Sequence, residues 1–252
     1  MTYCVGMRPE AGLVIIADTR TNAGIDNISV YNKLHMLAED EGRIIVVASA
    51  GSLSSTQSML AMLAEGLEPI EEGGPRRRVA DMPSMFRVAQ LVGEALSKAR
   101  GDVARALHGT KINADVSILL GGRIGDGPLV LYLVYSEGNF IECQRDCPYA
   151  QIGELKYGKP ILDRALQWES PLDEAVKVGL ISFDSTMRSN LSVGRPLDVI
   201  VIPTDPKAAV VRRRIEQEDV YFNELSANWG RLMNEARQQI ADPPFMNGAG
   251  IE

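Results

Sequence analysis

Two short apolar runs constrain the fold of this chain more than any other feature. Residues 13–18 (LVIIAD) and 43–50 (RIIVVASA) are almost continuously hydrophobic, and each has the length of a single β-strand. A strand with apolar side chains on both faces must be covered on both faces, so it belongs in the interior of a layered domain. The chain is therefore expected to contain buried sheets with other layers packed against them.

Segments with helical apolar spacing alternate with further strands along the rest of the chain. Helices are predicted over residues 52–66, 83–100, 158–168, 171–188 and 216–240, and strands over residues 2–7, 115–121, 128–136, 139–144, 197–202 and 208–212. Two sheets covered by two pairs of helices make a four-layer αββα sandwich, which is a mixed α+β fold. Without an internal repeat or a low-complexity tract, we expect one domain over residues 1–252, with a C-terminal helical extension from about 216.

The charge and the cysteine usage exclude several classes of function. A net charge of −7 disfavours nucleic acid or an anionic membrane as the main partner, because both repel an acidic protein. Three cysteines are too few for a disulfide framework, and the sequence contains no apolar run of membrane-spanning length; we also expect no signal peptide. We therefore expect a cytoplasmic protein that interacts with neither nucleic acid nor membrane.

Threonine directly follows the initiator methionine, at position 2. Methionine aminopeptidases remove Met1 when the next residue is small, so the mature chain is expected to begin with Thr2. A free N-terminal threonine combines a nucleophile with a base, since its α-amine has a reference pKa of roughly 7.7–8 and can accept the hydroxyl proton near neutral pH. Thr2 alone is weak evidence for catalysis, because most threonines at this position have no such role.

Four short motifs, taken in order, resemble the signature of proteasome β-type subunits. They are Thr2 itself, Asp18 in LVIIADTR, Lys33 in NKLHML and Gly51 in VASAGS. The whole chain, and most firmly residues 2–60, resembles the bacterial branch of ancestral β-subunits called Anbu. This resemblance implies the fold of the N-terminal nucleophile hydrolases, which is the αββα sandwich.

The resemblance assigns a role to each of these four residues. The Thr2 hydroxyl would attack an amide carbonyl and form an acyl-enzyme that water resolves. Lys33 would lower the pKa of the Thr2 amine by like-charge repulsion, and Asp18 is the anion that a buried lysine needs. The Gly51 N–H would bind the oxyanion that develops in the transition state.

The C-terminal part of the signature departs from the family pattern. The family has an aspartate, a serine and two glycines near the end of a helix; here Ser189 stands in place of that aspartate, and Ser192 matches the serine. Gly-Glu at residues 153–154 replaces a further supporting serine of the family. Ser189 and Ser192 are included among the expected site residues, and the altered surroundings predict a slow enzyme or an unusual substrate.

We predict a self-assembling threonine-type peptidase that needs no cofactor and no metal, since neither His35 nor His108 has metal-ligand spacing. Its expected partners are a peptide or protein substrate and further copies of the chain, in a ring or an open spiral. The sequence identifies no regulatory ATPase. Two alternatives stay open: a structural subunit that kept the fold but lost useful catalysis, and an amidase for a small or unusual amide.

Overall fold

The computed structural model describes residues 2–22, 28–110 and 112–246 of the chain. The chain divides into two compact units, Met1–Gln217 and Glu218–Glu252. The second unit contains the helix α5 (Val220–Gln238) and the short 3-10 helix η2 (Pro244–Met246). The first unit mixes helices and sheets, which confirms the predicted α+β class.

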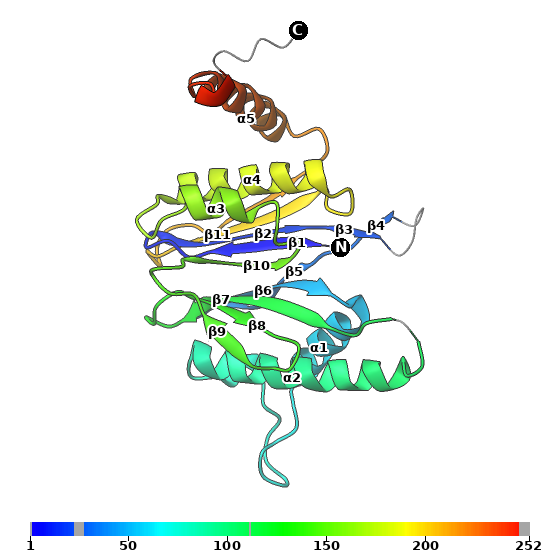
Figure 1. Ribbon diagram of the computed structural model, residues 1–252. Helices are drawn as coiled ribbons and strands as arrows, with labels where there is room; N and C mark the ends of the chain where they lie inside the picture. Colours follow the sequence, from blue (N-terminus) through cyan, green and yellow to red (C-terminus); the bar gives the residue numbers. More distant parts are fainter. Residues whose placement is uncertain (1, 23–27, 111, 247–252) are drawn as a thin grey trace. The chain divides into compact units, whose positions relative to one another are not determined.

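The first unit contains two five-stranded antiparallel sheets (Figure 1). The first sheet has the order β10 (Tyr149–Gly153), β1 (Tyr3–Met7), β2 (Gly12–Asp18), β11 (Leu197–Pro203), β12 (Val211–Ile215). The second sheet has the order β5 (Leu34–Asp40), β6 (Arg43–Gly51), β7 (Val116–Ile124), β8 (Val130–Val134), β9 (Phe140–Glu142). A separate two-stranded sheet pairs β3 (Arg20–Asn22) with β4 (Ile28–Val30).

A pair of helices covers the outer face of each large sheet. In Figure 1, α3 (Lys159–Ala165) and α4 (Leu172–Ser189) lie over the first sheet, and α4 contacts β1 and β2. On the opposite face of the unit, α1 (Leu53–Glu65) and α2 (Met85–Ala106) pack against the second sheet. A 3-10 turn, η1 (Val79–Asp81), precedes α2. The two sheets face each other in the middle of the unit.

The apolar run at residues 13–18 is buried on both faces, as its sequence predicts. Leu13 and Ile15 belong to the core between the two sheets, where Val46 and Leu119 of the second sheet also lie. Ile16 points the other way, since a side chain on Gly179 of α4 would meet it. Burial of this kind contributes about 25 cal/mol per Å² of apolar surface, so these strands account for much of the hydrophobic stabilisation.

Two strands of the first sheet differ from the sequence prediction. The strand predicted at residues 208–212 begins at Val211, because Asp205 starts a turn in which the Ala208 N–H donates to its carbonyl. The strand β10 was not predicted, since its sequence YAQIG shows no clear alternation. It nevertheless pairs along the whole of β1, with Tyr3 opposite Gly153. This pairing brings residues 153–154 next to the start of the chain.

Candidate active site

A buried ion pair joins Asp18 to Lys33. Asp18 is the last residue of β2 and is fully buried, and Lys33, just before β5, is 6% exposed. The Lys33 Nζ donates to Asp18 Oδ1 at 2.7 Å and to the backbone carbonyl of Arg20 at 2.5 Å. A buried ammonium is costly unless it is paired and hydrogen-bonded. These two acceptors therefore hold Lys33 as a fixed positive charge.

Backbone amides also lie close to the Asp18 carboxylate. The N–H of Tyr3 donates to Asp18 Oδ1 at 3.1 Å, and the N–H of Gly194 also faces the carboxylate. Burial raises the pKa of Asp18 above its usual value, while Lys33 and the two amides act in the opposite direction. Because Tyr3 directly follows Thr2, the same carboxylate holds both Lys33 and the backbone next to the threonine.

Thr2 precedes β1 and opens onto a pocket of about 130 Å³. The residues lining this pocket are Thr2, Thr21, Lys33, Ser49, Gly51, Leu53 and Thr56. The Thr2 carbonyl accepts a hydrogen bond from the Glu154 N–H at 2.7 Å, which fixes the threonine backbone against the end of β10. Met1, whose removal is predicted, lies outside the described residues. The threonine, the buried lysine and the glycine thus share one small pocket.

Gly51 ends β6 with a backbone conformation that favours glycine. Its φ is 123°, and a Cβ at this position would lie 2.2 Å from the backbone carbonyl oxygen of Asp115. The next residue, Ser52, donates its N–H to the same Asp115 oxygen at 2.9 Å and caps α1 by accepting the Ser55 N–H at 3.3 Å. The strand therefore turns sharply into the helix at the edge of the pocket.

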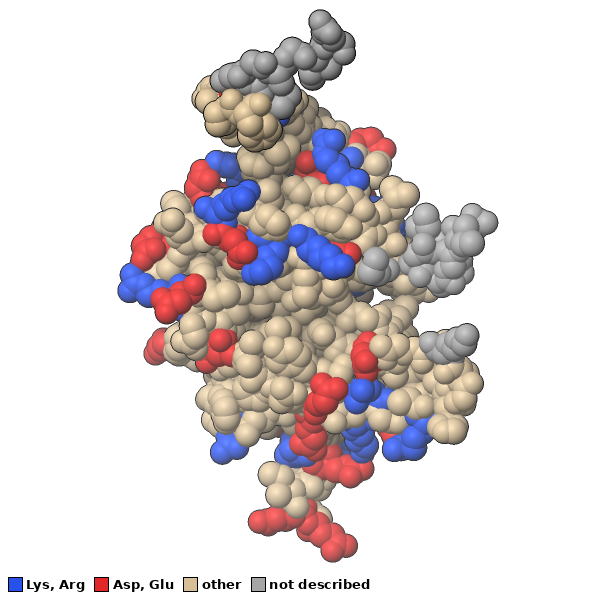
Figure 2. Space-filling view, in the orientation of Figure 1, with Lys and Arg blue, Asp and Glu red and all other residues tan. Residues whose placement is uncertain are grey.

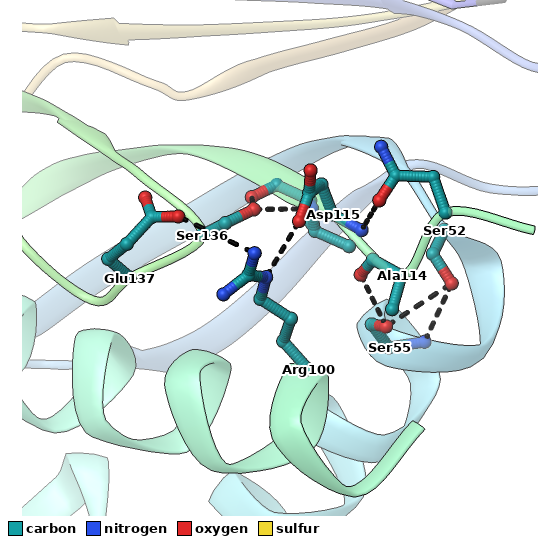
Figure 3. A network of polar contacts seen from close by, with 9 residues as sticks. Ser52, Ser55, Arg100, Ala114, Asp115, Ser136 and Glu137 are labelled. Atoms are coloured by element: carbon teal, nitrogen blue, oxygen red, sulfur yellow. Dashed lines mark hydrogen bonds and ion pairs between the residues drawn. The ribbon is translucent and has the colours of Figure 1, made fainter. Parts of the chain in front are cut away.

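Side chains from two helices hold residues 114–115 (Figure 3), and the backbone of Asp115 lies against Gly51. From α2, the Arg100 Nε donates to Asp115 Oδ1 at 2.7 Å; this hydrogen bond is the main reason that the pKa of Asp115 lies below its usual value. From α1, the Ser55 hydroxyl donates to the carbonyl of Ala114 at 2.8 Å. The position of the Gly51 amide therefore depends on this network.

Of the two predicted serines, one ends α4 and the other follows it, and neither forms a hydrogen bond with Thr2 among the described residues. Ser189 is the last residue of α4 and is exposed, and Ser192 is half-buried in the following turn. The Ser192 N–H donates to Asn190 Oδ1 at 3.0 Å. Within the described part of the chain, neither serine hydroxyl makes a hydrogen bond. The structure brings Thr2, Asp18, Lys33 and Gly51 together, but it gives these hydroxyls no comparable contact.

Glu154 and Asn190 are residues of the site that the sequence did not predict. The Glu154 side chain is buried, and its Oε2 accepts a hydrogen bond from Asn190 Nδ2 at 2.9 Å. The one sequence signal for Glu154 was the departure at residues 153–154 from the family pattern. No comparable signal marked Asn190, because its role depends on how the end of α4 meets β10.

Among residues 2–22, 28–110 and 112–246, no group of three or more His, Cys, Asp or Glu side chains could hold a metal ion. No helix of this part of the chain is long and apolar enough to cross a membrane. Acidic and basic side chains are interspersed on the face in Figure 2, without a large field of one sign. Among the described residues, the pocket that contains Thr2, Lys33 and Gly51 is therefore the candidate active site.

Solved structures of proteasome-like β-subunits match the chain over almost its whole length. Anbu, the ancestral β-subunit, from Yersinia bercovieri is 41% identical, with a TM-score of 0.85 over 96% of this chain and 98% of that one. Anbu from Hyphomicrobium sp. strain MC1 is 40% identical, with a TM-score of 0.83 over 96% and 99%. A helical assembly of the Anbu complex from Pseudomonas aeruginosa contains a chain 38% identical, with a TM-score of 0.85 over 96% and 98%.

The fold and these matches define a proteasome-like β-subunit. The chain belongs to the Anbu family of ancestral β-subunits. No family model matches the sequence, and no curated protein matches it. The predicted resemblance to this family is confirmed.

Proposed function

We propose that this protein is an N-terminal threonine hydrolase of the peptidase type, active after removal of Met1. The observation that carries the proposal is the shared pocket of Thr2, Lys33 and Gly51, with Lys33 held by the buried carboxylate of Asp18. We assign its two sheets and two helix pairs to the four-layer αββα sandwich of the N-terminal nucleophile hydrolases. Residues up to about 216 are proposed to form the catalytic domain, and the remainder an extension.

In the proposed reaction the Thr2 Oγ1 attacks a substrate carbonyl, and its proton passes to the α-amine of the same residue. The negative charge on the carbonyl oxygen is stabilised by the Gly51 N–H, an interaction whose loss costs roughly 3–4 kcal/mol of barrier. The ammonium then gives its proton to the leaving amine, and water hydrolyses the resulting ester. Lys33 keeps the amine neutral between steps because a second positive charge in the pocket is unfavourable.

Ser189 and Ser192 keep a proposed supporting role at this site. Each serine is tested by its alanine variant, with the rate of substrate hydrolysis as the readout. Since Ser192 is half-buried whereas Ser189 is exposed, Ser192→Ala is expected to have the larger effect. If neither variant lowers the rate, the supporting role is wrong.

The small pocket indicates the class of substrate. A volume of about 130 Å³ with threonine and serine hydroxyls in its lining accommodates a small side chain better than an aromatic one. We therefore propose cleavage after small residues. The same size favours one alternative, an amidase for a small amide.

The proposal is tested with a panel of peptide amides that differ only in the residue before the scissile bond. The same panel distinguishes a peptidase from an amidase for a small amide. Wild type is expected to cleave the alanine substrate faster than the phenylalanine substrate, and Thr2→Ala to cleave neither. Leu53→Ala, which enlarges the pocket, should narrow the difference between the two substrates. Hydrolysis of small amides without cleavage of any peptide would favour the amidase, and equal hydrolysis by wild type and Thr2→Ala would exclude both.

We also propose that the chain self-associates, in a ring or an open spiral. The helical assembly of the relative from Pseudomonas aeruginosa supports this proposal. Repeated head-to-tail contacts close a ring only if the rotation between subunits divides a full turn, and otherwise they wind into a spiral. Light scattering that gives the mass of a 27.5 kDa monomer at micromolar concentration would contradict self-association.

A further inference from the structure

We infer that the carboxylate of Glu154 is the counter-ion of the Thr2 α-ammonium, and that Glu154 positions the threonine for the reaction. This inference rests on the proposed function, because the α-amine exists only when Met1 is absent. It adds to the reaction a residue outside the set Thr2, Asp18, Lys33 and Gly51.

The first argument is the burial of a carboxylate that forms no ion pair with the described residues. Glu154 is 8% exposed, and its oxygens accept hydrogen bonds from the Lys156 backbone N–H at 3.1 Å and from Asn190 Nδ2 at 2.9 Å. Both donors are neutral, and no Lys, Arg or His side chain of the described residues forms an ion pair with Glu154. Burying a carboxylate without a positive partner is costly. A cation close to this carboxylate would relieve that cost.

The second argument is the place of Glu154 relative to the start of the chain. Its N–H donates to the Thr2 carbonyl at 2.7 Å, and Gly153 lies opposite Tyr3 in the pairing of β10 with β1. A Cβ on Gly153 would lie 2.0 Å from the Thr2 carbonyl oxygen, so the two backbones are in close contact. Removal of Met1 creates a positive charge on the residue that Glu154 already contacts.

The third argument is that Glu154 also fixes the turn that serves Asp18. Asn190, which donates to the Glu154 carboxylate, accepts the N–H of Ser192 at 3.0 Å. The same turn continues to Gly194, whose N–H faces the Asp18 carboxylate. A chain of contacts thus runs from Thr2 through Glu154 and Asn190 towards the Asp18–Lys33 pair. Glu154 is a positioning residue, since it acts through Thr2 and this turn.

The charges around Thr2 give the direction of the effect. Lys33, which shares the pocket with Thr2, disfavours a protonated amine, while the carboxylates of Asp18 and Glu154 favour it. On α4, which packs against β1, the Asp184 carboxylate is paired with the Arg188 guanidinium at 3.0 Å. Burial raises the pKa values of the neighbouring Tyr3 and Cys4, so both stay neutral. Loss of the Glu154 charge should therefore lower the pKa of the Thr2 amine.

The test is a titration of the Thr2 amine that does not require turnover. The full chain is produced with a removable N-terminal fusion, so that cleavage leaves Thr2 as the first residue. Potassium cyanate adds only to neutral amines, and mass spectrometry of the N-terminal peptide gives its rate of addition as a function of pH. Wild type is compared with Glu154→Gln, which removes the charge, Glu154→Asp, which keeps it, and Asn190→Ala, which removes only the amide donor.

We expect the midpoint of the Glu154→Gln titration to lie roughly one pH unit below that of wild type, as for an amine that loses a nearby opposite charge. The midpoints of Glu154→Asp and Asn190→Ala should stay closer to that of wild type. A purely structural role for Glu154 would not produce this pattern. If Glu154→Gln does not fold, Glu154→Ser provides the neutral variant. Equal midpoints in wild type and the folded neutral variant overturn the inference. Failure of the proposed function would show separately, as peptide hydrolysis that survives Thr2→Ala.

Discussion

The Lys33 ammonium lies 2.7 Å from the Asp18 carboxylate, and both groups are buried beside Thr2. Asp18 is the last residue of β2 in the first sheet, and Lys33 lies just before β5 in the second sheet. The ion pair therefore bridges the two sheets at the place where the chain begins. A fixed positive charge at this place is the feature that an N-terminal nucleophile requires, because it favours a neutral amine.

Lys33→Ala is expected to slow acylation of Thr2 by at least about ten-fold near neutral pH, because loss of the nearby positive charge raises the pKa of the Thr2 amine by about one unit or more. It should also lower the free energy of unfolding by about 3 kcal/mol, because it leaves the Asp18 carboxylate buried and unpaired. Lys33→Arg should fail as well, since the bulkier, planar guanidinium does not fit the buried position in which the ammonium contacts Asp18 and the Arg20 carbonyl. The measurements are labelling by a β-lactone and urea denaturation. Wild-type reactivity of Lys33→Ala over roughly pH 6–9 would show that the lysine does not set the state of the amine.

Asp18 gives a prediction on the pH dependence of stability. The pKa of Asp18 is about 3.9 in the unfolded chain and is raised in the folded protein. At a pH between these two pKa values, the folded state therefore binds the proton more tightly than the unfolded state does. Stability contributed by this group is therefore lost as the pH rises through that window. Relative to Asp18→Asn, wild type should lose free energy of unfolding as the pH increases from about 4. Urea denaturation at several pH values checks this, and a relative gain of wild type over the same window would contradict it.

Gly51→Ala should abolish acylation and destabilise the protein. The new Cβ would lie 2.2 Å from the Asp115 oxygen, at a φ of 123° that residues with side chains rarely adopt. Gly101→Ala is the matched control, because Gly101 lies within α2 and has no atom within 4 Å of an added Cβ. This control should gain roughly 0.5–1 kcal/mol from its higher helix propensity and keep its reactivity. If both variants have the same thermal midpoint and the same labelling rate, Gly51 has no special role.

Arg100→Ala tests whether the network in Figure 3 holds the turn from Gly51 into α1 in the position needed for the proposed reaction. Its ion pair with Asp115 is partly exposed, so the loss of stability should stay below about 1 kcal/mol. The acylation rate should nevertheless fall several-fold, because Asp115 supports the backbone of Gly51 and Ser52. Arg105→Ala removes a comparable exposed pair with Asp102 on the same helix and should leave the rate unchanged. Equal acylation rates for Arg100→Ala and Arg105→Ala would show that the network does not influence the reaction.

The sequence predicted the parts of this protein that local patterns determine. The buried run at residues 13–18 marks β2, and the carboxylate of Asp18 at its end pairs with Lys33. Lys33 and Gly51 were identified from short motifs with a fixed order, and the structure places them with Thr2 around one pocket. Whether these residues perform catalysis remains a prediction.

The parts that were missed depend on contacts between distant segments. The strand β10 lacks an alternating pattern of its own and is defined by its pairing with β1, which is about 145 residues away in the chain. Glu154 approaches Thr2 only because of that pairing, and Asn190 meets Glu154 only where α4 ends. Neither segment has a hydrophobic periodicity from which these contacts could be predicted.

Intact-mass measurement after treatment with a β-lactone tests the nucleophile itself. The lactone ring opens when a hydroxyl attacks its carbonyl, and the product ester adds the whole mass of the reagent to the chain. We predict that wild type begins at Thr2 and gains one label, that Thr2→Ser gains a label more slowly, and that Thr2→Ala gains none. Equal labelling of wild type and Thr2→Ala, or a wild-type chain that retains Met1, would contradict the assignment of Thr2 as the catalytic nucleophile.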